Sequence, residues 1–128
     1  MIGFGRVPQR PSGDPNLNPE AVVERQLDAY NARDLERFLA CYAETIRVYR
    51  PPAVEPAIAG KAAFGTFYAT QRFNRAGLHA EIVQRMILGN RIIDHERITG
   101  AREHPFEVAV VYEIAGGVIQ CMWSFEAG

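Results

Sequence analysis

The chain has 128 residues and a mass of 14.3 kDa, the size of a single domain. Its 48% hydrophobic and 23% charged residues are ordinary for a globular protein. The formal net charge of −1 argues against a nucleic-acid-binding protein and provides no polybasic membrane patch. Two features are less usual: Lys61 is the only lysine among 14 basic residues, and the chain carries 7 Phe, 5 Tyr and 1 Trp.

Residues 1–17 are broken by proline and glycine and lack the apolar core of a secretory signal, so they are expected to form an irregular leader. The longest unbroken apolar run, residues 38–43, is far shorter than the ~20 residues of a membrane-spanning helix. No membrane association is therefore expected.

Cys41 and Cys121 lack the spacing of metal ligands and do not form a disulfide framework by themselves. Reduced thiols and a cytoplasmic location are the simplest interpretation. The three histidines show no paired spacing, so no metal site is predicted.

Two helices are predicted to follow the leader. Asn18 and Pro19 are typical of an N-cap and a first helical position, and apolar residues then recur at helical spacing. Residues 31–33 interrupt the pattern, and Asp34 caps a second helix. Because the connection is so short, the two helices should pack as a hairpin. A third helix is predicted over residues 61–72.

From Thr45 the apolar period changes to two, which predicts a strand that ends at Pro51-Pro52. Residues 53–60 are expected to form a loop. Four further strands, separated by turns rich in glycine, are predicted at Leu78–Leu88, Arg91–Thr99, Phe106–Ile114 and Val118–Glu126. Strands joined by short turns are antiparallel.

This order of elements predicts an α+β fold over residues 18–128. Three N-terminal helices should pack on one face of a curved antiparallel sheet, in the order α-α-β-α-β-β-β-β.

Three segments resemble the nuclear transport factor 2-like superfamily, in its SnoaL-like and ketosteroid-isomerase-like branch. They are residues 27–43, Gly60 with the following helix that carries Phe67 and Tyr68, and residues 89–100. The resemblance extends over residues 19–126. It implies a cone in which the bent sheet wraps the helices and leaves a pocket between them. Its members include isomerases, epoxide hydrolases, polyketide cyclases, dehydratases and non-catalytic modules, so the pocket residues must decide the function.

Strand alternation predicts which side chains point into this pocket. The polar residues expected inside are Arg50, Asp94 and Glu96. The predicted ligand-contacting residues from strands and helices together are Phe38, Val48, Phe64, Phe67, Tyr68, Val110, Tyr112, Cys121, Trp123 and Phe125. For the aromatic residues among them, packing in a solid core is an alternative to lining a pocket.

The resemblance does not extend to the known catalytic sets. A ketosteroid isomerase needs a carboxylate base, a tyrosine and a protonated aspartic acid, and Arg50, Gln26 and Val110 stand at the matching positions. Arginine stays charged and accepts no proton, which excludes steroid isomerisation by that mechanism. The Asp-Arg-Asp arrangement of limonene-type epoxide hydrolases is missing in either register of the strand that carries Glu96.

The remaining candidates for chemistry are Glu96, Asp94 and Arg50. Burial in an apolar pocket raises the pKa of a carboxyl group, and a nearby guanidinium lowers it. We therefore expect Glu96 to be the general acid or base and Arg50 to orient an anionic or carbonyl group of a ligand. The alternative is an internal ion pair between Arg50 and one of the two carboxylates.

Two function classes follow. The first is an isomerase-, cyclase- or hydratase-like enzyme that acts without a cofactor on a small, largely apolar ligand. The second is a non-catalytic ligand-sensing or dimerisation module. Glu96 and Asp94 that both point into an open cavity within reach of Arg50 would favour the enzyme, whereas a cavity filled by Trp123 and the phenylalanines would favour the module.

The outer face of the sheet is too apolar to lie wholly in water. Its predicted residues are Ile93, His95, Arg97, Ala109, Val111 and Glu113. A symmetric homodimer that packs sheet on sheet would cover this face, and the resemblance implies such a dimer as well.

Overall fold

The computed structural model describes residues 18–127. The leader predicted over residues 1–17 lies outside the described residues. The described part of the chain contains three helices: α1 (Pro19–Asn31), α2 (Leu35–Leu39) and α3 (Lys61–Gln71). Both predicted caps are confirmed, because Ala21 N donates to Asn18 Oδ1 at 2.8 Å and Arg37 N donates to Asp34 Oδ1 at 3.2 Å.

The strands form one sheet in the order β2-β1-β6-β5-β4-β3. Their bounds are β1 (Tyr42–Tyr49), β2 (Ile58–Ala59), β3 (His79–Leu88), β4 (Arg91–Thr99), β5 (Phe106–Ala115) and β6 (Val118–Glu126). The antiparallel meander from β3 to β6 is confirmed. The sheet is nevertheless mixed, because β1 pairs with β6 in parallel, and the predicted loop 53–60 contributes the two-residue strand β2.

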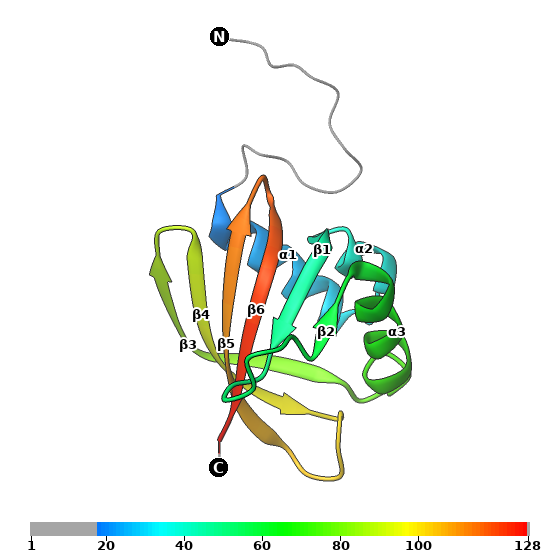
Figure 1. The fold of residues 1–128 in the computed structure, drawn as a ribbon. Helices are drawn as coiled ribbons and strands as arrows, with labels where there is room; N and C mark the ends of the chain where they lie inside the picture. Colours follow the sequence, from blue (N-terminus) through cyan, green and yellow to red (C-terminus); the bar gives the residue numbers. More distant parts are fainter. Residues whose placement is uncertain (1–17, 128) are drawn as a thin grey trace, which may run out of the picture.

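The α+β architecture is confirmed: the three helices lie against one face of the curved sheet (Figure 1). Helix α1 packs across β3, β4, β5 and β6, while α3 packs against β1 and β2. The fully buried side chains between these layers are largely aromatic and β-branched, with Phe38, Tyr42, Phe64, Ile46, Ile92 and Ile119 among them. The layers therefore share one core.

Strands β4 and β5 keep a strict alternation. Ile92, Asp94, Glu96 and Ile98 of β4 are all buried on the helix side, and so are Val108, Val110, Tyr112 and Ile114 of β5. The predicted inward direction of Asp94, Glu96, Val110 and Tyr112 is confirmed.

Bulges interrupt the alternation in the neighbouring strands. In β6, Ile119 lies opposite Ile114 and Cys121 lies opposite Glu113, so Gln120 is an extra residue. In β3, Val83 is the extra residue between Ile82 and Gln84. Each bulge moves every later side chain of its strand to the other face of the sheet.

Candidate functional site

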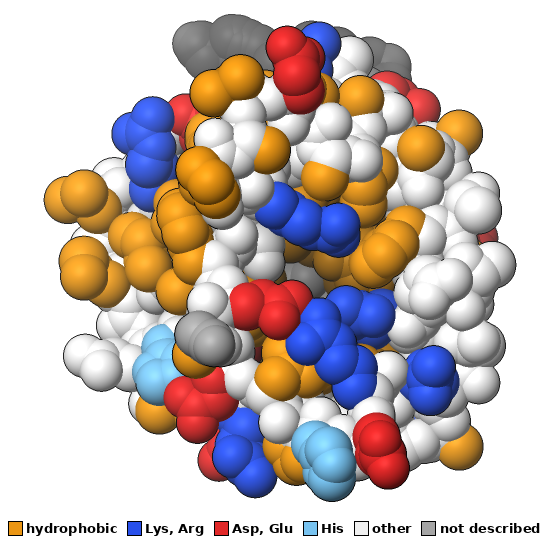
Figure 2. Space-filling view, turned by 60° about the horizontal axis from the view of Figure 1, so that its bottom comes forward, with side chains coloured by type: hydrophobic (Ala, Val, Ile, Leu, Met, Phe, Trp, Pro, Cys, Tyr) orange, Lys and Arg blue, Asp and Glu red, His pale blue; other side chains and the backbone are white. Residues whose placement is uncertain are grey.

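A cavity of about 310 Å³ opens between the helices and the inner face of the sheet. Charged side chains border the hollow, and apolar side chains wall it (Figure 2). Side chains from α1, α2, α3 and five of the six strands line it. The cavity is mostly apolar with a few convergent polar groups, which is typical of a small-molecule site.

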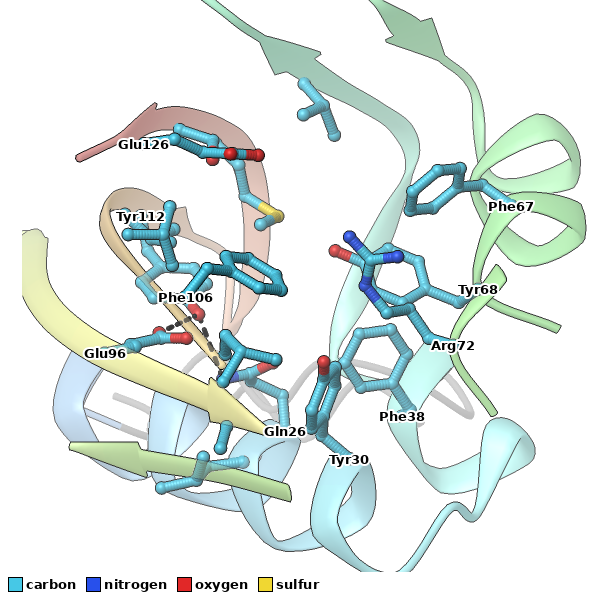
Figure 3. A pocket seen from close by; sticks show the side chains of 18 of the residues that line it. Gln26, Tyr30, Phe38, Phe67, Tyr68, Arg72, Glu96, Phe106, Tyr112 and Glu126 are labelled. Carbon is cyan, nitrogen blue, oxygen red and sulfur yellow. Dashed lines mark hydrogen bonds between the residues drawn. The ribbon is translucent and has the colours of Figure 1, made fainter. Parts of the chain in front are cut away.

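The floor of the cavity is a chain of hydrogen bonds that ends on Glu96 (Figure 3). Tyr112 Oη donates to Glu96 Oε2 at 3.0 Å, Gln26 Nε2 donates to Tyr112 Oη at 3.3 Å, and Tyr42 Oη donates to Gln26 Oε1 at 2.8 Å. All four residues are buried. Burial keeps the pKa of Tyr112 well above its usual value, so its hydroxyl stays protonated and donates.

Glu96 is the titratable group of this floor. Its pKa is raised to about 7, mainly because burial disfavours its charged form and also because the charge of Asp94 opposes it. The hydrogen bond from Tyr112 and the charge of Arg85 act in the opposite direction. The one hydrogen bond that Glu96 receives within residues 18–127 reaches Oε2, which leaves Oε1 facing the cavity. A carboxyl group with a pKa near neutrality is suited to both taking and giving a proton.

Aromatic rings form the helix-side wall. Phe38 lies at the centre of a cluster in which its ring centroid is 4.8 Å from that of Tyr68 and 6.0 Å from that of Tyr30. Burial raises the pKa of Tyr68 to about 12. The wall thus offers ring faces and neutral hydroxyls to a ligand.

Three arginines and one carboxylate line the rim. Arg102 makes a two-pronged ion pair with Glu126, with N–O distances of 3.0 and 2.6 Å. The guanidinium carbons of Arg50 and Arg72 lie 5.4 and 5.2 Å from the centre of the Phe67 ring. The rim is therefore basic and holds its guanidinium groups on aromatic rings.

The model of the SnoaL-like domain matches residues 23–122, most of the described fold. The chain belongs to the SnoaL-like family. No curated protein is significantly similar to it.

Several solved structures share the fold of this chain. A cystatin-fold protein of unknown function from Novosphingobium aromaticivorans shares 19% identity at a TM-score of 0.76, with 85% of this chain and 98% of that chain covered. A protein from Kribbella flavida, provisionally described as a ketosteroid isomerase, shares 20% identity at a TM-score of 0.74, with 86% of this chain and 78% of that chain covered. A protein from Sinorhizobium meliloti, provisionally described as a polyketide cyclase, shares 16% identity at a TM-score of 0.70, with 81% of this chain and 93% of that chain covered. At these identities the likeness concerns the fold alone.

Of the predicted catalytic residues, Glu96 and Arg50 line this SnoaL-like pocket, at its floor and its rim. Asp94 does not line it, so the expectation for Asp94 was wrong. Arg85 binds Asp94 from β3, with N–O distances of 2.6 and 2.9 Å, and closes it off from the cavity. No ion pair joins Arg50 to either carboxylate within residues 18–127, so the alternative of an internal bridge with Arg50 was wrong as well.

Most predicted ligand-contacting residues do line the cavity, namely Phe38, Val48, Phe67, Tyr68, Val110 and Tyr112. Phe64 does not, because it is fully buried behind Phe38, with ring centroids 5.8 Å apart. For Phe64 the core-packing alternative is the one that the structure supports.

Cys121, Trp123 and Phe125 were placed on the wrong face of β6. The bulge at Gln120 turns them outward and brings Met122, Ser124 and Glu126 to the cavity. Trp123 stacks on Tyr49 on the outer face instead, with ring centroids 5.7 Å apart. Trp123 therefore does not fill the cavity.

Strand alternation missed several lining residues. Tyr30 and Arg72 belong to helix ends, and Arg102 belongs to the loop between β4 and β5. The helical stripe of α1 marks Tyr30 as buried, but nothing in the sequence separates a core position from a cavity wall.

Within the described residues 18–127, no group of three or more metal-ligating side chains is close enough to hold a metal ion. In the same part of the chain, no helix combines the length and apolarity needed to cross a membrane. Both cysteines are free thiols, and partial burial raises the pKa of each.

Proposed function

We propose that this SnoaL-like protein is an acid–base enzyme that moves a proton within a small, largely apolar ligand. Isomerase-, cyclase- and hydratase-like reactions all contain such a step. Glu96 takes a proton from a carbon acid of the ligand and returns it to another atom, while Tyr112 holds Oε2 in place. The observation that carries the proposal is a buried carboxyl group with a pKa of about 7 at the floor of an open cavity.

Kemp elimination of 5-nitrobenzisoxazole tests this role without knowledge of the natural ligand. In that reaction a base removes the C3 proton, the N–O bond breaks, and a coloured cyanonitrophenolate is released. We expect saturable turnover that rises with pH around 7, because only ionised Glu96 can accept the proton. Glu96→Gln should lower kcat/KM about 100-fold or more.

Glu81→Gln is the matched control, because Glu81 is an exposed glutamate of β3. Equal turnover by wild type and Glu96→Gln would remove Glu96 from the mechanism. Saturable binding of the probe without turnover would favour the second candidate, a non-catalytic ligand-binding module.

We also propose a homodimer formed by the outer face of the sheet. The bulge in β6 adds Cys121 and the Tyr49–Trp123 stack to a face that already carries Ile93 and Val111. A second copy offers the same apolar surface, so a symmetric contact would cover both.

Sedimentation equilibrium tests this contact. At micromolar concentration the wild type should show twice the chain mass, and Val111→Glu should show the chain mass, because it places a charge in the middle of the contact. Val54→Glu is the control, since Val54 lies 85% exposed in the loop before β2. A wild type that sediments as a monomer contradicts the dimer.

A further inference from the structure

The rim of the pocket has an excess of positive charge. Arg50, Arg72 and Arg102 face one carboxylate, Glu126, and Arg102 occupies both of its oxygens. Within residues 18–127, Arg50 and Arg72 have no carboxylate within ion-pair distance. The rim therefore keeps two arginines without an ion pair beside an apolar cavity, and the one rim carboxylate that acts on their charge, Glu126, is already bound to Arg102.

These two arginines are held by an aromatic ring. Arg50 follows β1 and Arg72 follows α3, yet both guanidinium carbons lie within 5.4 Å of the centre of the Phe67 ring. Stacking on a ring uses the flat face of a guanidinium and leaves its N–H edges available. Within residues 18–127, Arg50 donates no hydrogen bond, and Arg72 donates one to the backbone oxygen of Gln71 at 3.0 Å. The Arg72 guanidinium also contacts the Tyr30 hydroxyl, where it acts against the rise that burial causes in the pKa of Tyr30. Two like charges brought together in this way repel each other, and a bound anion would relieve that repulsion.

The arginines and Glu96 lie on opposite sides of the cavity. Figure 3 shows Arg72 on the α3 side, beside Tyr68, and Glu96 across the cavity on β4, with Phe106 between them. A ligand that spans the cavity meets a guanidinium at one end, apolar side chains along its body and the carboxyl group at the other end.

We infer that the ligand is an amphiphilic anion, whose carboxylate or phosphate group binds Arg50 and Arg72 while its apolar body extends toward Glu96. This inference rests on the proposed function, because it assigns the substrate class of the same pocket. The planar fork of arginine matches both oxyanions. In this orientation the anion is kept away from Glu96, so it does not oppose ionisation of that carboxyl group.

Three probes with the same ring body and different heads test the inference: 2-naphthoate, 2-naphthyl phosphate and 2-naphthalenemethanol. Their affinities are measured by calorimetry at low and high salt. We expect one or both anions to bind about 10-fold or more tightly than the alcohol, and the advantage to shrink in high salt. Comparison of the two anions then identifies which head the rim prefers.

In Arg50→Gln/Arg72→Gln, the anions should lose most of this advantage while the alcohol binds as before. Arg47→Gln is the matched control, because Arg47 is an exposed arginine of β1 that does not line the pocket. Equal affinity for all three probes, or undiminished anion binding by the double variant, overturns the inference but leaves the proposed acid–base function standing. Binding of none of the probes also overturns the inference, and Kemp turnover then decides the proposed acid–base function by itself.

Discussion

Glu96→Gln is expected to unfold with a larger free energy than the wild type, by about 3 kcal/mol at pH 8 and by about 1 kcal/mol or less at pH 5. The pKa of Glu96 is about 7 in the folded chain against a usual value of 4.5, and its side chain is almost fully buried. The folded state thus keeps a proton that the unfolded chain has released. Glutamine carries no charge at any pH and can still accept the hydrogen bond from Tyr112.

The direction of the pH effect follows from the raised pKa. The contribution of neutral Glu96 to stability is complete below pH 4.5 and is lost as the pH rises through 7. Urea unfolding at pH 5, 6, 7 and 8 should therefore show a gap between the two proteins that widens with pH. Glu126→Gln is the control and should lower the free energy of unfolding. Arg102 lowers the pKa of Glu126, so the ionised form of Glu126 stabilises the fold. A gap for Glu96→Gln that stays constant from pH 5 to 8 would show that Glu96 ionises as an ordinary glutamate.

The inner faces of β4 and β5 were predictable because each strand runs without a bulge from its turn. A period of two then fixes every side chain once one of them is placed, and Glu96 and Tyr112 follow from it. The helix caps at Asn18 and Asp34 were also predictable, since capping is a local interaction.

The inner face of β6 was not predictable, because one inserted residue reverses the pattern. Ile119 before Gln120 and Met122 after it both point inward, and no residue type marks Gln120 as the insertion. The hydrogen bond between Gln26 and Tyr112 at the floor of the pocket was also not predictable from the strands alone. Gln26 and Tyr112 are 86 positions apart, and their contact depends on where α1 crosses the sheet, which alternation within single strands does not determine.

The ion pair between Arg85 and Asp94 was not predictable either, because it depends on the bulge in β3. The bulge at Val83 places Arg85 directly opposite Asp94, on the inner face. Arg50 shares the inward parity that alternation assigns it, but it lies at the rim rather than beside the carboxylates. For Arg50, parity therefore predicted the face of the sheet correctly but gave no position along the length of the cavity.

Arg85→Met is expected to destabilise the fold by about 3–5 kcal/mol, because it leaves the charge of Asp94 buried without a partner. The Asp94 side chain has no exposed surface, and the Arg85 side chain is 12% exposed. Arg85 also binds Glu20 and Glu24 of α1, so its loss weakens the packing of that helix on the sheet. Asp94→Asn in the same chain removes the buried charge and should recover about half of the loss. Arg91→Met is the matched control, since its ion pair with Glu113 is partly exposed and contributes at most about 1 kcal/mol.

The same variant should change the chemistry of the pocket in a way that simple loss of stability does not. With Arg85 gone, the negative charge of Asp94 is no longer compensated and opposes ionisation of Glu96 more strongly, which raises the pKa of Glu96 further. In Arg85→Met that remains folded, the pH of half-maximal Kemp turnover should move upward, and Asp94→Asn should move it back below the wild-type value. A shift in Arg85→Met that Asp94→Asn does not reverse would show that Arg85 acts on Glu96 by another route than the charge of Asp94.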